Sequence, residues 1–285
     1  MYLCILLIYN TKMTKNYSKE EVIEIFKEYL DTQCTIESIY KKYGWTLKRL
    51  FKEYGLSKRK ERTGHYPLTW LGEKITNEIE AYFVGFMYAD GTLNDTQVAI
   101  KLKNQESEFK LLSSFRNYIT PEQQLTYEKD KTAVKLVINS KIFSSNLQNL
   151  GILQKKTYKT LVIPEMDEFL LRHFIRGYFD GDGTIYYDRK YIKANICSIN
   201  YDFLVLLQQI LNRNNISCKI NTEIREGKNL LSPQGDYKTT YKNMYRLVFS
   251  SKTIKNELKN YFYDNSTIFL QRKRDLFFKE NTEVN

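Results

Sequence analysis

The chain has 285 residues, 42% of them hydrophobic, so it is long enough to bury a core and too apolar to be a disordered protein. Lys and Arg total 44 against 33 Asp and Glu, and the net charge of +11 favours a polyanionic partner such as nucleic acid, although an ordinary lysine-rich protein has the same balance. The four cysteines are scattered and there are only two histidines, which argues against a disulfide framework and a zinc cluster.

The first residues of the chain include an apolar stretch, Leu3 to Tyr9. This stretch is too short to span a bilayer, and it lacks the basic start and the small-residue cleavage site of a signal peptide. We therefore expect no membrane association and no secretion. The expected location is intracellular, in the cytoplasm or an organelle, or in a phage-infected cell. Residues 1–13 are expected to be a peripheral extension.

Residues 14–60 have the pattern of three short helices. Ser18 is a candidate N-cap, followed by two acidic residues in the first helical turn. A turn at Gly44 precedes a third helix with Lys48, Arg49 and Lys52 on its outward side. This arrangement is typical of a helix-turn-helix domain, whose last helix contacts the DNA major groove. A small bundle that only packs on the rest of the chain is the alternative. Residues 61–77 are expected to form a basic linker.

Two copies of one unit follow, at residues 78–160 and 161–285. Three segments of the first copy recur in the second copy, in the same order and at offsets of 92, 111 and 117 residues. They pair Tyr82–Leu93 with Phe174–Ile185, Leu136–Lys141 with Leu247–Lys252, and Leu153–Lys156 with Leu270–Lys273. Because the offsets only grow, the second copy carries insertions, and its polar segment 227–242 is expected to be a longer hairpin loop.

Each copy is expected to begin with a buried helix, which in the first copy spans Glu78 to Tyr88 and ends at an Asp-Gly pair. Strands are expected at Gln97–Lys103 and Lys219–Arg225, where apolar and polar residues alternate, and helices near 108–118 and 202–212. The pattern predicts an α+β fold with an αββαββα order in each copy. One face of each sheet is expected to be covered by helices, and the other to be polar and basic.

The repeated Asp-Gly pair predicts a site with two carboxylates. Gly85 and Gly177 leave room for another backbone, so the first helices of the two copies are expected to pack together and bring Asp90 and Asp182 side by side. Adjacent carboxylates repel each other unless they are protonated or bridged by a divalent metal, and Mg²⁺ prefers oxygen ligands. Metals beside a phosphate stabilise the attacking and leaving oxygens, which indicates phosphodiester hydrolysis. A simple helix stop is the alternative for one Asp-Gly pair, and the duplication argues against it.

The segments Phe83–Gly91 and Ile175–Gly183 resemble the two motifs of single-chain LAGLIDADG homing endonucleases. The resemblance implies two repeats in a pseudo-two-fold monomer, with Mg²⁺ or Mn²⁺ bound at Asp90 and Asp182 next to Ala89 and Gly181. It also implies a catalytic cation after each sheet, here Lys156 and Lys273, for which a solvated helix end is the alternative. The first motif has Tyr88 where the second has Asp180, and we expect this difference to make the two half-sites unequal.

The resemblance further implies that the sheets bind double-stranded DNA at a long, asymmetric target. Candidate contacts are the outward Lys, Arg and Asn side chains of the strands: Lys101, Lys103, Lys135, Lys193, Asn195, Lys219, Asn221, Arg225 and Arg246. A solvated sheet face is the alternative. Two other functions stay open, an RNA maturase acting on its host intron and a non-enzymatic transcription regulator. The presence of both motif acids disfavours the regulator, and the absence of an initial Cys or Ser disfavours an intein.

Overall fold

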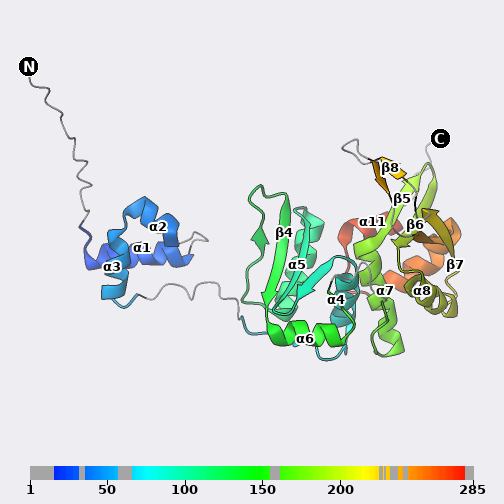
Figure 1. Cartoon of the computed structure of the whole chain (residues 1–285), viewed down its shortest axis with the longest axis horizontal. Coiled ribbons are helices and arrows are strands. Elements are labelled where there is room, and N and C mark those ends of the chain that lie inside the picture. The colour runs from blue at the N-terminus through cyan, green and yellow to red at the C-terminus, as the bar shows by residue number, and fades with distance from the viewer. Residues whose placement is uncertain are drawn as a thin grey trace, which may run out of the picture. The chain divides into compact units, whose positions relative to one another are not determined.

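The computed structural model describes residues 16–31, 36–56, 66–154, 161–224, 227, 229–231, 237–239 and 243–279. The chain forms two compact units, Met1–Thr63 and Gly64–Asn285 (Figure 1). None of the helices in the described ranges combines the length and the apolar composition that a membrane span requires.

The N-terminal unit contains three helices, α1 (Lys19–Asp31), α2 (Ile36–Tyr43) and α3 (Thr46–Glu53). The Ser18 Oγ accepts a hydrogen bond from the Glu21 backbone N–H, and the Glu21 carboxylate accepts one from the Ser18 N–H. This reciprocal pair is a capping box, so the expected cap at Ser18 is confirmed. Leu47 and Phe51 of α3 are buried against α1 and α2, whereas Lys48, Arg49 and Lys52 are exposed.

The first repeat consists of α4 (Glu78–Ala89), β1 (Gly91–Asn94), β2 (Gln97–Lys103), α5 (Glu106–Ile119), β3 (Thr126–Tyr127), β4 (Ala133–Asn139) and α6 (Lys141–Asn149). Its strands form one antiparallel sheet in the order β1-β2-β4-β3. Helix α5 packs on β2 and β4. Val98 and Ile100 are buried beneath it, whereas Lys101 and Lys103 are exposed, so the alternation expected of β2 is confirmed.

The second repeat consists of α7 (Glu168–Asp182), β5 (Gly183–Asp188), β6 (Tyr191–Ser198), α8 (Tyr201–Arg213), β7 (Cys218–Ile224), β8 (Asn229–Leu231), β9 (Tyr237–Thr239), β10 (Met244–Phe249), α9 (Ser251–Thr253), the π-helical turn η2 (Ile254–Leu258), α10 (Lys259–Tyr263) and α11 (Gln271–Phe278). The main sheet has the order β5-β6-β10-β7. Strands β8 and β9 pair with each other inside the segment where the sequence predicts a longer hairpin loop.

Strand β7 differs in detail from its prediction. It begins at Cys218 and ends at Ile224, and Arg225 lies outside the described residues. Ile220 and Ile224 were expected to point inward, and they are only half-buried, because β7 is an edge strand with a neighbour on one side. Apart from the inserted hairpin and the additional helical segments after β10, both repeats have the expected αββαββα order, and the α+β fold class is confirmed.

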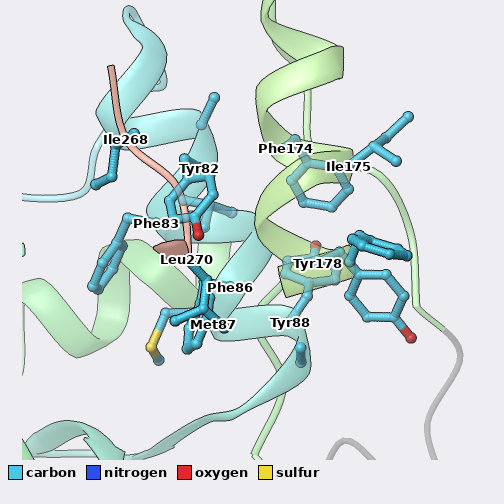
Figure 2. Close-up of a cluster of buried hydrophobic side chains, with 14 of the residues drawn as sticks. Tyr82, Phe83, Phe86, Met87, Tyr88, Phe174, Ile175, Tyr178, Ile268 and Leu270 are labelled. Atoms are coloured by element: carbon cyan, nitrogen blue, oxygen red, sulfur yellow. The ribbon is translucent and has the colours of Figure 1, made fainter. Parts of the chain in front are cut away.

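Helices α4 and α7 form the contact between the two repeats. Both are buried along most of their length, and their side chains belong to one hydrophobic core that extends through both repeats. Figure 2 shows Tyr82, Phe86 and Tyr88 of α4 beside Phe174, Ile175 and Tyr178 of α7. The helices approach closely at two glycines. A Cβ on Gly85 would lie 1.9 Å from the Phe174 carbonyl oxygen, and one on Gly177 would lie 2.1 Å from that of Tyr82.

Candidate functional site

The two repeated acids lie at the C-terminal ends of the paired helices. Asp90 is the C-cap of α4, and its backbone N–H donates to the Phe86 carbonyl oxygen at 2.9 Å. Asp182 is the last residue of α7. Both residues are exposed although the helices that carry them are buried. The fold therefore presents two carboxylates to solvent at the end of a buried helix pair.

A close contact holds these two helix ends together. A Cβ on Gly181 would lie 2.2 Å from the Ala89 Cβ and 3.6 Å from the Asp90 backbone nitrogen. Ala89 directly precedes Asp90 in the chain, and Gly181 directly precedes Asp182. The structure therefore brings together Asp90, Asp182, Ala89 and Gly181, which come from positions about ninety residues apart in the chain.

The electrostatic character of this end is negative. The C-terminus of each helix carries a partial negative charge, and each adds a carboxylate, so a cation is favoured there. Asp182 also accepts a hydrogen bond from the Tyr178 hydroxyl one turn earlier, and burial together with this carboxylate raises the pKa of Tyr178. Mg²⁺ is commonly bound by one or two protein carboxylates, while phosphate and water oxygens supply its remaining ligands. Two exposed carboxylates at adjoining helix ends fit this requirement. No cluster of three or more His, Cys, Asp or Glu side chains suited to a metal occurs in the described ranges.

Lys273 lies next to these acids but is not at a solvated helix end. It is 4% exposed, and its Nζ donates at 2.8 Å to the carbonyl oxygens of both Phe179 and Asp180, with that of Gly183 also in reach. Burial lowers the pKa of Lys273 to about 8, against the opposing effect of the carboxylates of Asp180, Asp90 and Asp182. Lys273 thus caps the last turn of α7 from the side. Its counterpart Lys156 lies outside the described residues.

Tyr88 and Asp180, which occupy the same position in the two repeated motifs, differ in both chemistry and contacts. Asp180 is 1% exposed and accepts hydrogen bonds from the Tyr82 hydroxyl at 2.6 Å and the Leu270 N–H at 2.8 Å. Burial raises the pKa of the Asp180 carboxyl. The hydroxyl of Tyr88 instead lies 3.0 Å and 2.8 Å from the carbonyl oxygens of Leu150 and Val162. Both side chains fasten their helices to other parts of the fold.

Comparison with known families applies to the second of the two repeats. Residues 170–261 match the LAGLIDADG-like domain family. The matched segment contains most of α7, including Asp182, and the whole sheet β5-β6-β10-β7. No curated protein matches the chain.

Several solved structures are similar to this chain at low identity. The homing endonuclease I-DmoI in complex with DNA and Mn is 17% identical with a TM-score of 0.41, over 67% of this chain and 98% of that one. The N-terminal LAGLIDADG domain of WhiA is 18% identical with a TM-score of 0.42, over 70% and 88%. A mutant of I-SmaMI is 10% identical with a TM-score of 0.45, over 70% and 89%.

The candidate DNA contacts of the first repeat lie on the sheet face that α5 leaves uncovered. Lys101 of β2 is directly opposite Lys135 of β4, and Lys103 is two residues further along β2. Lys101 and Lys103 are exposed and Lys135 is half-buried. The structure therefore groups these three cations on one surface.

The sheet of the second repeat has a matching face. Lys193, Lys219 and Asn221 are exposed there, and Arg246 is half-buried and lies opposite Asn221. Asn195 has the same strand parity but is only 6% exposed. Its neighbours cover it, so it is not open to a ligand in the way the sequence pattern predicts.

One buried ion pair near the other end of the helix pair was not predicted from the sequence. Arg176 of α7 is fully buried, and its Nη2 lies 2.6 Å from the Glu78 Oε1 at the start of α4. Glu78 also accepts hydrogen bonds from the backbone and side chain of Thr267. A charged residue among the apolar residues of α7 is the signal that would have revealed a partner, because buried charges are paired.

Proposed function

We propose that this chain is a site-specific endonuclease that hydrolyses double-stranded DNA with a divalent metal, Mg²⁺ or Mn²⁺, at Asp90 and Asp182. The observation that carries the proposal is the contact between Gly181 and Ala89, which brings two exposed carboxylates to one place. Two sheets with basic, uncovered faces accompany this pair, one from each repeat. A nuclease needs these two features together: acids for the metal and cations for the phosphate backbone.

The carboxylates of Asp90 and Asp182 would hold the metal, with the backbone carbonyl oxygens of Ala89 and Gly181 beside them. When bound, the metal would stabilise the charge that develops on the phosphate oxygens. Lys273 keeps the last turn of α7 in place through its bonds to the main-chain carbonyl oxygens. In this way it fixes the position of Asp182 and adds positive charge beside the phosphate. We propose that Lys156, at the matching position of the first repeat, supplies a second cation near the phosphate.

The outward side chains of the two sheets would contact the major groove and the phosphates. Because the repeats differ in sequence, the two half-sites of the target would differ as well, and one chain would bind a long asymmetric site as a monomer. The exposed cations Lys48, Arg49 and Lys52 of α3 would add a helix-turn-helix contact outside the central site. Such an enzyme would act in intron mobility.

The test is selection of cleaved sequences from a library of randomised duplexes in Mg²⁺. We expect the wild type to cut a defined set, and Asp90→Asn and Asp182→Asn to cut none while still binding the selected duplex in Ca²⁺. Asp202→Asn, which removes an exposed acid from the first turn of α8, is the matched control and should cut normally. Absence of cleavage by the wild type across the library, or cleavage by both Asn variants, would contradict the proposal. In the first case, splicing of a host intron by the protein would favour the maturase.

A further inference from the structure

The uncovered face of the first sheet carries an acid between its cations. Lys101 and Lys135 are directly opposite each other on β2 and β4, where like charges repel. The Glu128 Oε1 lies 2.8 Å from the Nζ of both lysines. Hydrogen bonds from Lys101 and Lys135 lower the pKa of Glu128 to about 2, so its carboxylate is ionised at neutral pH.

The second sheet also pairs cations with acids, here in two separate ion pairs. The Arg246 Nη2 lies 2.7 Å from the Glu223 Oε1, and the Lys193 Nζ lies 2.5 Å from the Asp188 Oδ2. Strand parity places Asp188 and Lys193 on the uncovered face, because they alternate with the buried Ile185, Ile192 and Ala194. Arg246 lies on the same face, because it alternates with the buried Leu247 and Phe249 of β10. Four cations proposed to contact DNA are therefore already paired with carboxylates, in both repeats.

These ion pairs are at the surface, so their contribution to folding stability is small. Their effect on the binding of a DNA duplex is larger, because each carboxylate is near the place where a phosphate would have to lie. A duplex that makes only backbone contacts must draw the cations away from their acids. Its phosphates are then repelled by carboxylates that have lost their cations. A duplex with suitable base edges can also give the carboxylates a donor, such as the amino group of cytosine.

We propose that Glu128, Asp188 and Glu223 are specificity-determining residues that keep the sheet cations from binding DNA of arbitrary sequence. The inference rests on the proposed function, since it concerns how the same sheets choose their target. The acids stay paired with the sheet cations until base edges of the correct sequence take the place of the acids; these cations are Lys101, Lys135, Lys193 and Arg246. Their removal leaves a face that binds phosphate more readily and distinguishes sequences less well.

The experiment compares Glu128→Gln with Glu106→Gln. Both remove one negative charge from an exposed ion pair, but Glu106 pairs with Lys110 within α5, on the helix that covers the opposite side of the sheet. Binding of a labelled random-sequence duplex is measured by fluorescence anisotropy in Ca²⁺ between 50 and 200 mM KCl (about a fourfold range). Thermal unfolding of both variants checks that they are folded.

We expect Glu128→Gln to bind the random duplex more tightly than the wild type at the lowest salt. Each additional phosphate contact steepens the logarithmic salt dependence by about 0.9, so the loss of affinity over this range should be about threefold larger than for the wild type. Glu106→Gln should match the wild type within about twofold, since it adds no phosphate contact. In the cleavage library, Glu128→Gln should accept more sequences in one half-site than Glu106→Gln does.

If the wild type binds duplex and the two variants behave alike in affinity, salt dependence and cleaved sequences, the inference is overturned while the proposed function stands. If the wild type binds no duplex in any of these buffers, the proposed function fails and the inference fails with it. A larger salt dependence and a broader sequence range for Glu128→Gln alone would support the inference.

Discussion

The contact between Gly181 and Ala89 can be tested by exchanging which of the two residues carries a methyl group. In Gly181→Ala, the new Cβ would lie 2.2 Å from the Ala89 Cβ, whereas non-bonded carbons pack at about 3.5–4.0 Å. The helix ends must therefore separate by roughly 1.3 Å or more. In the exchange variant Gly181→Ala/Ala89→Gly, the new Cβ at position 181 no longer meets the methyl group of residue 89.

The expected energies follow from packing and helix propensity. Overpacking in Gly181→Ala costs about 1–3 kcal/mol, which a better helix propensity offsets by up to about 1 kcal/mol. Ala89→Gly loses about 0.8 kcal/mol for one buried methyl group and up to about 1 kcal/mol for the glycine. The double variant no longer has the overpacking cost. It should therefore be more stable than the sum of the two single effects predicts, by about 1–3 kcal/mol.

The assay is chemical denaturation followed by tryptophan fluorescence in a Trp45→Phe background. The sequence contains two tryptophans, and Trp70, which is 9% exposed and lies in the C-terminal unit, is then the remaining reporter. Cleavage should follow the same pattern, because a displacement of about 1 Å at a reacting site can cost about 100-fold in rate. Additive single effects, within about 0.5 kcal/mol, would refute the close approach of the two helix ends.

Three further predictions concern the same helix pair. Gly85→Ala should destabilise the C-terminal unit by at least the upper end of about 1–3 kcal/mol, because its Cβ would meet the Phe174 main-chain oxygen; wild-type stability in denaturation would contradict the packing. Arg176→Met should cost about 3–5 kcal/mol by leaving the Glu78 carboxylate without its cation, and Glu78→Gln in the same chain should recover part of this loss. No recovery would instead place the cost in packing and in the lost hydrogen bonds from Arg176 to the Phe262 and Ile268 carbonyl oxygens. Burial lowers the pKa of His173 to about 4, from its ordinary value of 6.5. The unfolded chain therefore takes up a proton between these two values that the folded chain does not, so stability should fall as pH decreases from about 6.5 to about 4. His173→Gln should flatten this fall in unfolding measurements above pH 5, and an unchanged slope would assign it to other groups.

Much of the fold was predictable because its signals are local. The alternation of Val98, Ile100 and Leu102 with polar residues identified β2, and the apolar composition around Gly85 identified α4 as a buried helix. The duplication added a further prediction, because it implied that Asp90 and Asp182 occupy equivalent positions at the ends of two equivalent helices. Together these patterns indicated the element order, the fold class and the meeting of two helices.

The partners of individual charged side chains were decided only by the tertiary structure. The repeat singled out Lys273 through its match with Lys156, but its burial against the main chain of α7 depends on packing across about ninety residues. Glu128 was not singled out from the sequence, because a carboxylate between two lysines becomes visible only when β2, β3 and β4 are adjacent. Hydrophobic periodicity records which face of an element is buried, because burial acts on every residue of that face. It does not record which polar atoms meet there, since that depends on distances between elements that are remote in the chain.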